Sequence, residues 1–90
     1  MELTLTREDM WNADDTLAFC ISQILKKYRE DIKGYPANFT EEAYCDMIDT
    51  IITACDNYVK RWELADDSDI YIEMHDALEL FKTNFSSFWT

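Results

Sequence analysis

The fold is decided by the stretch Phe39-Thr40-Glu41-Glu42-Ala43-Tyr44. Thr40 carries the side-chain oxygen that caps a helix, and the two glutamates place negative charge in the first turn, where the helix dipole favours it. Phe39 precedes the cap and predicts a hydrophobic staple onto Tyr44. The helix is predicted over about residues 41–63, because apolar residues recur there at helical spacing. These residues are Tyr44, Met47, Ile48, Ile51, Cys55, Tyr58 and Trp62.

Upstream, the turn Gly34-Tyr35-Pro36 predicts the end of a preceding helix. Gly34 suits a left-handed C-terminal position, and proline biases the residue before it to extended backbone. This helix is predicted over about residues 13–33, with Asn12 as its N-cap. Its apolar stripe consists of Leu17, Ile21, Ile24, Leu25, Tyr28 and Ile32. Residues 1–11 form an arm that we expect to pack across the bundle, with Trp11 as a large anchor.

Downstream, a third helix is predicted over about residues 68–88, and it begins in the acidic cluster 66–69. Its apolar stripe consists of Tyr71, Met74, Leu78, Phe81, Phe85 and Phe88. Each of the three helices has about 20 residues and a length of about 30 Å. Similar lengths and short connections predict an all-α fold, an antiparallel three-helix bundle with the arm packed on it, as a single domain over residues 1–90.

The composition excludes several classes of protein. Hydrophobic residues make up 48% of the 90 residues, enough for a core, while one Gly and one Pro leave few turn residues for a β-sandwich. The net charge of −11 argues against direct binding to nucleic acid and to anionic membranes. The sequence shows neither a spanning apolar run nor the features of a signal peptide at its start, so we expect a cytoplasmic protein.

The residues that could catalyse a reaction or bind a metal do not form a known motif. Cys20, Cys45 and Cys55 lack CxxC spacing, and the single histidine, His75, cannot complete a typical zinc set with them. The only glycine is Gly34, so a glycine-rich phosphate loop is missing. We therefore predict no enzyme activity, no metal and no cofactor.

The remaining signal is an acidic face. Residues 41–90 carry twelve of the 19 acidic residues but three of the 8 basic ones. On a helical wheel, the acids of the second and third helices lie away from the apolar stripes, with Ile72 and Leu80 among them. Such apolar residues inside a polar rim are typical of a protein interface, whereas a purely solvated face remains the alternative. The predicted partner-binding residues are Glu42, Asp46, Asp49, Asp56, Asp69, Ile72, Glu73, Asp76 and Leu80.

Nearly the whole chain resembles a family of small helical proteins encoded by tailed bacteriophages. The resemblance is carried by residues 9–18, by Gly34-Tyr35-Pro36 with Thr40-Glu41-Glu42, by residues 77–81, and by Phe85 and Phe88-Trp89. The chain departs from the family at Tyr44, Cys55 and Thr90, where the family tends to have Trp, an aromatic and an acidic residue. The resemblance implies a phage protein in the host cytoplasm, and it supplies no site.

Together these features predict a non-catalytic phage accessory protein that binds, and inhibits, a host protein with a basic surface, such as a nucleic-acid-handling or defence factor. One alternative is a self-assembling structural or scaffolding protein, a homo-oligomer held by apolar residues outside the core, including Phe19 and Trp89. Phe19 could equally lie beneath the N-terminal arm. Another alternative is an oligomer that sequesters a small ligand, with Lys26, Lys27 or Arg29 lining the pocket.

Overall fold

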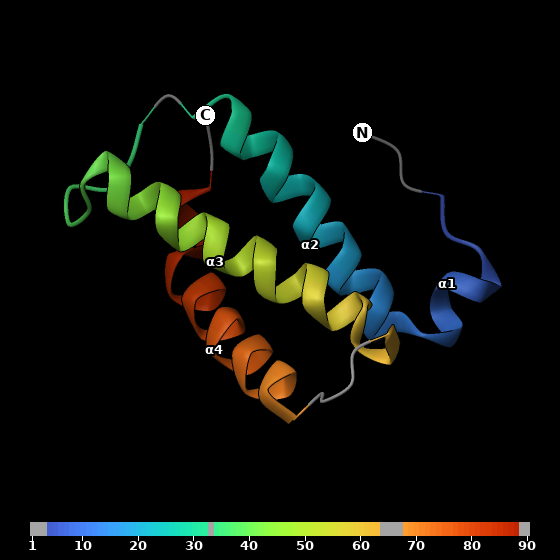
Figure 1. Ribbon diagram of the computed structural model, residues 1–90. Helices are drawn as coiled ribbons and strands as arrows, with labels where there is room; N and C mark the ends of the chain where they lie inside the picture. The colour runs from blue at the N-terminus through green and yellow to red at the C-terminus, as the bar shows by residue number, and fades with distance from the viewer. Residues whose placement is uncertain (1–3, 33, 64–67, 89–90) are drawn as a thin grey trace.

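The computed structural model describes residues 4–32, 34–63 and 68–88, and within these ranges the chain is helical and has no strand (Figure 1). The elements are α1 (Arg7–Trp11), α2 (Ala13–Glu30), α3 (Glu41–Val59), the 3-10 helix η1 (Arg61–Glu63), α4 (Ser68–Asn84) and the 3-10 helix η2 (Phe85–Ser87). The predicted all-α bundle is therefore confirmed. None of the described helices is long and apolar enough to cross a membrane.

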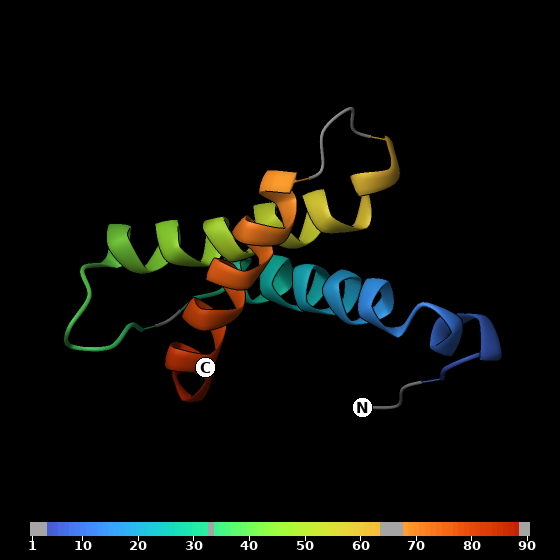
Figure 2. The same cartoon turned by 90° about the horizontal axis from the view of Figure 1, so that it is seen from below.

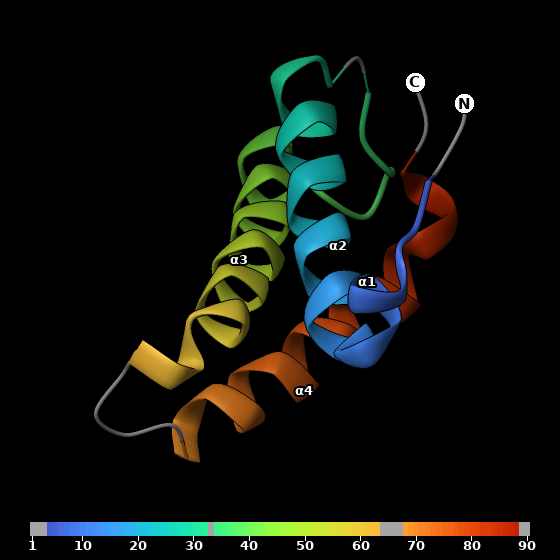
Figure 3. The same cartoon turned by 90° about the vertical axis from the view of Figure 1, so that its right-hand side faces the viewer.

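The bundle is built around α3. Helices α2 and α3 lie side by side and run antiparallel, while α4 crosses them at a steep angle (Figures 2 and 3). Helix α3 packs against both α2 and α4, whereas packing between α2 and α4 is much sparser. The bundle is consequently open along the line between α2 and α4.

Helix α3 takes this central place because it is apolar over a wide face. It begins as predicted, since the Thr40 side chain accepts a hydrogen bond from the Ala43 backbone N–H at 3.1 Å, and the rings of Phe39 and Tyr44 lie 5.4 Å apart. Its buried residues are Tyr44, Met47, Ile48, Ile51, Ala54 and Cys55. Tyr44 and Ile48 are completely inaccessible to solvent.

The buried tyrosine hydroxyls are satisfied by the end of the chain. The Tyr44 hydroxyl lies 2.9 Å from Ser87 Oγ and 3.2 Å from the Tyr28 hydroxyl. The Phe88 ring packs edge-on against Tyr28 at 5.8 Å. Because a buried hydroxyl needs a hydrogen-bond partner, these contacts fix η2 against α2 and α3.

Three local predictions are wrong. Helix α2 ends at Glu30, with the cap N–H of Asp31 donating to Tyr28, and Gly34 does not have a positive φ, so it is not a left-handed cap. The Asn12 side chain makes no capping hydrogen bond. Trp11 is 81% exposed and does not anchor the arm.

The arm instead contains a short helix that the apolar pattern missed, because five residues are too few for periodicity. Thr6 and Asp9 form a capping box at the start of α1. The arm is held to α2 by the Thr16 hydroxyl, which donates to the Asp9 carbonyl at 2.8 Å. The predicted start of the third helix falls partly outside the described residues.

The buried lines of α2 and α4 are shifted relative to the predicted stripes. Helix α2 buries Ala18, Ser22 and Leu25, and α4 buries a line through Ile70, Met74 and Ala77. Five predicted core residues are exposed instead: Leu17, Ile24, Tyr71, Leu78 and Phe85. The shift arises because α2 and α4 pack mainly on α3, so that the residues flanking the buried lines face the opening between them.

Candidate functional site

Helices α3 and α4 enclose a groove of about 630 Å³ that we call the acidic groove. Its lining residues are Asp46, Asp49, Thr50, Thr53, Ala54 and Asn57 from α3, with Glu73 and Asp76 from α4. Positions three or four apart on a helix lie on one side, so α3 lines one wall over several turns and α4 lines the other. Four of the predicted partner-binding carboxylates are thereby brought together.

The four carboxylates of the acidic groove, Asp46, Asp49, Glu73 and Asp76, are exposed and largely unneutralised. Arg29 of α2 reaches one of them, with its Nε 3.1 Å from Asp49 Oδ1, and this hydrogen bond raises the pKa of Arg29. No other described cation forms an ion pair with the four carboxylates. The groove therefore carries strong negative potential on two facing walls.

The arrangement suits ammonium or guanidinium groups, because carboxylates on separate helices can each accept charge-assisted hydrogen bonds from a different basic side chain. Among the described residues, no group of three or more metal-ligating side chains is placed to hold a metal ion. The lysines and arginine suggested for an anionic ligand do not converge either. Lys26, Lys27 and Arg29 each pair with a carboxylate of the same chain: Asp56, Glu30 and Asp49.

Three further predicted residues lie outside the acidic groove but are exposed. Glu42 is in the first turn of α3 and Asp69 in the first turn of α4. Ile72 is 62% exposed, and it directly precedes Glu73 of the groove. Ile72 thus has the exposure that the sequence predicted for an apolar anchor among acids.

Two predicted partner-binding residues are placed differently. Asp56 lies half-buried between α2 and α3, where it accepts hydrogen bonds from Ser22 at 2.5 Å and Lys26 at 3.0 Å. Burial alone raises the pKa of Asp56, but these two donors outweigh it and the pKa is lowered. The helical wheel predicted an exposed Asp56 because only one side of α3 was assigned to the core. In the structure, α2 packs on α3 from a second side.

Leu80 is the other correction. It is half-buried and packs against the core, since it continues the buried line of Ile70, Met74 and Ala77 along α4. It is therefore not an exposed anchor among the acids.

A second groove, of about 370 Å³, lies between α2 and α4, and we call it the apolar groove. Its lining residues are Asp14, Leu17, Ala18, Ile21, Tyr58, Tyr71, Met74, His75 and Leu78. Ala18 and Met74 are buried, whereas Leu17, Tyr71 and Leu78 are exposed at its walls. The sequence prediction missed this groove because it assigned these wall residues to the core.

One end of the apolar groove is closed by a polar cluster that we call the Arg61 clasp, formed by Asp14, Asp15, Tyr58 and Arg61. The Tyr58 hydroxyl donates to Asp14 Oδ2 at 2.6 Å, and Arg61 forms an ion pair with Asp14 at 3.5 Å and a hydrogen bond to Asp15. The guanidinium, 6% exposed, stacks on Tyr58 at 4.2 Å. The cluster fixes the end of α3 against the start of α2.

The hydrogen bond between Tyr58 and Asp14 shifts the pKa values of both residues. It lowers the pKa of Asp14, because the tyrosine hydroxyl stabilises the carboxylate. It also raises the pKa of Tyr58 to about 12, with burial adding to the effect. Both groups therefore keep the protonation states that hold the clasp together at neutral pH.

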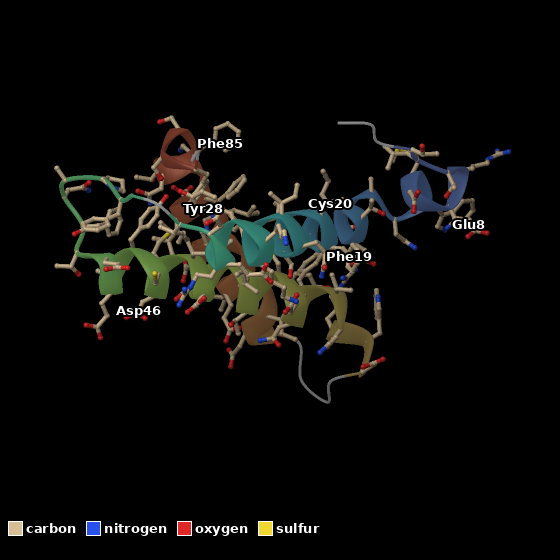
Figure 4. All side chains as sticks on the ribbon, turned by 90° about the horizontal axis from the view of Figure 1, so that it is seen from above. Glu8, Phe19, Cys20, Tyr28, Asp46 and Phe85 are labelled. Atoms are coloured by element: carbon tan, nitrogen blue, oxygen red, sulfur yellow. The ribbon has the colours of Figure 1, made fainter. Side chains whose placement is uncertain are left out.

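The two grooves lie beside the same helix, α4, and differ in chemistry. Figure 4 shows Asp46 of the acidic groove below the α3 ribbon, and the exposed Phe85 of η2, which follows α4, on the other side of α3. No protein-family model, curated protein sequence or solved structure matches the chain. Its function is therefore argued from the geometry and charge of the grooves.

Proposed function

We propose that the chain is a non-catalytic protein that binds, and thereby inhibits, another protein through the acidic groove. The observation that carries this proposal is the convergence of Asp46, Asp49, Glu73 and Asp76 from two helices onto one groove. With the resemblance to tailed-phage proteins, the proposal becomes a phage accessory protein that acts on a host protein in the host cytoplasm.

The charge of the groove specifies the chemistry of the partner. A basic protein segment would place ammonium or guanidinium groups between the facing walls, where carboxylates are already positioned. Opposite potentials also speed the encounter, and this effect weakens as salt increases. Proteins that handle nucleic acids carry such basic surfaces because they bind phosphates. A protein bound to such a basic surface would prevent the nucleic acid from binding there.

Ile72 extends the proposed interface beyond electrostatics. It is an exposed apolar side chain next to Glu73, and interfaces commonly combine a desolvated apolar anchor with a charged rim. The charges then accelerate and orient the encounter, while the anchor slows dissociation.

The test compares two variants that lose the same four charges. The groove variant carries Asp46→Asn, Asp49→Asn, Glu73→Gln and Asp76→Asn. The control variant carries Glu8→Gln, Glu30→Gln, Glu63→Gln and Glu79→Gln, which are exposed acids outside the acidic groove. Both variants should retain helical circular dichroism.

Binding is measured first to a synthetic lysine- and arginine-rich peptide by calorimetry, and then to host proteins retained from lysate and identified by mass spectrometry. We expect the groove variant to lose about tenfold or more in affinity for both, and the control to lose much less. Equal losses of affinity in the two variants would show that only the net charge matters, and would reject the acidic groove as the binding site.

A further inference from the structure

The exposed apolar residues that line the apolar groove, Leu17 on α2 and Tyr71 and Leu78 on α4, are continued beyond it by Ile24 and Phe85. On α2, Leu17 and Ile24 are 64% and 63% exposed and lie seven residues apart. Along α4 and η2, Tyr71, Leu78 and Phe85 are also exposed and again seven residues apart. Residues seven apart lie on one side of an α-helix, so Leu17 and Ile24 share a side of α2, and Tyr71 and Leu78 share a side of α4.

The charge of the chain restricts what can cover these stripes. With a net charge of −11, two identical chains repel each other, so they can meet only where carboxylates are few or balanced. The acids of α4 that line the acidic groove, Glu73 and Asp76, belong to the other side of that helix. Along the stripe of α4, by contrast, the helical spacing places His75 and Lys82 between the apolar residues.

Helix α2 gives the same balance of charge. Lys27, which forms an ion pair with Glu30, and Asp31 lie beside Ile24, and Asp14, at the other end of the stripe, is paired with Arg61. The face therefore carries both signs of charge around an apolar centre. Such a face is complementary to itself, as an isologous interface requires, whereas a strongly basic protein is attracted to the acidic groove instead.

The size of the face also fits. Five exposed side chains, two of them aromatic, provide a few hundred Å² of apolar surface, the size at which an exposed patch on a monomer marks an interaction site. A standard interface takes about 800 Å² from each copy, so the stripes would form its centre and the surrounding polar residues its rim.

We propose that a second copy of this chain covers the apolar groove, giving a two-fold symmetric dimer through α2 and α4. The dimer leaves both acidic grooves on its outside, because they are lined by the opposite side of α4.

The first measurement is sedimentation equilibrium of the full chain from low micromolar to near-millimolar concentration. We expect a transition from the chain mass of 10.7 kDa to twice that mass. High salt should strengthen the association slightly, since the contact is apolar and the net repulsion is screened. A wild-type chain that stays monomeric throughout would overturn the proposal and leave the face for a different protein.

The second measurement uses Ile24→Lys with Ile72→Lys as its matched control. The two isoleucines are 63% and 62% exposed, and both variants change the net charge equally, but Ile24 shares its side of α2 with Leu17 of the apolar groove, whereas Ile72 directly precedes Glu73 of the acidic groove. We expect Ile24→Lys to weaken dimerisation about tenfold or more and Ile72→Lys to leave it within about twofold. Equal effects of the two variants would reject the face.

Leu78→Lys repeats the measurement from α4 in case Ile24→Lys perturbs folding, which circular dichroism and urea unfolding would reveal. The groove variant with four neutralised carboxylates should dimerise at least as well as wild type. A failure of dimerisation and a failure of basic-peptide binding are therefore distinguishable.

Discussion

The acidic groove and the apolar groove share a wall and differ in almost everything else. Helix α4 lines the acidic groove with Glu73 and Asp76, and it lines the apolar groove with Tyr71, His75 and Leu78. The buried line of α4 runs between these two sets. A single amphipathic helix can thus present two different chemistries when it crosses its neighbour at a steep angle instead of lying along it.

The ion pairs beside the two grooves also differ in their exposure to solvent. The ion pair at the acidic groove, Arg29 with Asp49, is exposed on both sides, at 40% and 52%. In the Arg61 clasp at the apolar groove, the arginine side chain is 6% exposed and Asp15 is 24% exposed, while Asp14 is 54% exposed. Water screens the Arg29–Asp49 pair more strongly than the Arg61–Asp15 pair, so loss of the arginine is expected to cost more stability at the clasp than at the acidic groove.

The largest expected effect tests whether the two ion pairs contribute differently to stability. Arg61→Met should lower the free energy of unfolding by about 3 kcal/mol, because it leaves the partly buried Asp15 carboxylate without its partner. Urea unfolding at neutral pH measures the loss. Arg29→Met removes the same group from the exposed pair and should change stability little. Similar losses in both variants would show that the two ion pairs are not different in kind.

A smaller effect concerns the alkaline behaviour of the clasp. The unfolded chain releases the Tyr58 proton near its ordinary pKa of 10.0, while the folded chain holds it to about 12. Unfolding therefore releases a proton in this window, and stability falls as pH rises from about 10 to 12. Cys55 adds a fall between about pH 9 and 11, since burial and then the charge of Asp56 raise its pKa from 9.0 to about 11.

Tyr58→Phe should flatten this fall without abolishing it, because the Cys55 contribution remains. It should also lower the melting temperature at neutral pH by about 3–5 °C through loss of the hydrogen bond to Asp14. Urea midpoints across the alkaline range test the slope, with Tyr35→Phe, an exposed tyrosine, as the control. A slope identical to wild type in Tyr58→Phe would contradict the assignment to Tyr58.

The smallest expected effect concerns the electrostatic repulsion among the carboxylates of the acidic groove. The four groove carboxylates repel one another across the facing walls, so the groove variant should melt about 2–4 °C higher than wild type in low salt. The difference should shrink in high salt, where the repulsion is screened. The control variant loses two acids that pair with Lys27 and Lys82, and its gain should be smaller. Thermal melts followed by circular dichroism would show any reversal of this order.

The fold class and the central helix could be predicted from the sequence because their signals are local. The cap at Thr40, the staple from Phe39 to Tyr44 and the wide apolar face of α3 lie within one stretch of chain. The charge bias also indicated the carboxylates of the acidic groove. Their convergence could not be predicted, because it depends on the angle at which α4 crosses α3.

The buried lines of α2 and α4 were predicted only in part, since Leu25 and Met74 belong to the predicted stripes and are buried, whereas other stripe residues are exposed. Large apolar residues such as Leu17 and Leu78 dominate a periodicity count, but the buried lines also contain small residues, Ala18, Ser22 and Ala77, which the predicted stripes left out. Small side chains let helix axes approach closely and contribute little to a hydrophobic pattern. The same count cannot separate a residue that faces its own core from one that faces an opening beside it.

The order of packing has a consequence for how the chain is made. The helices that pack against each other most closely are neighbours in sequence, α2 with α3 and α3 with α4. Such short-range topology favours rapid folding, and it allows each helix to dock as it leaves the ribosome. Among the hydrogen bonds of the described residues, the one from Tyr28 to Ser87 spans the longest stretch of chain, so η2 is expected to take its place after α2 and α3 have packed together.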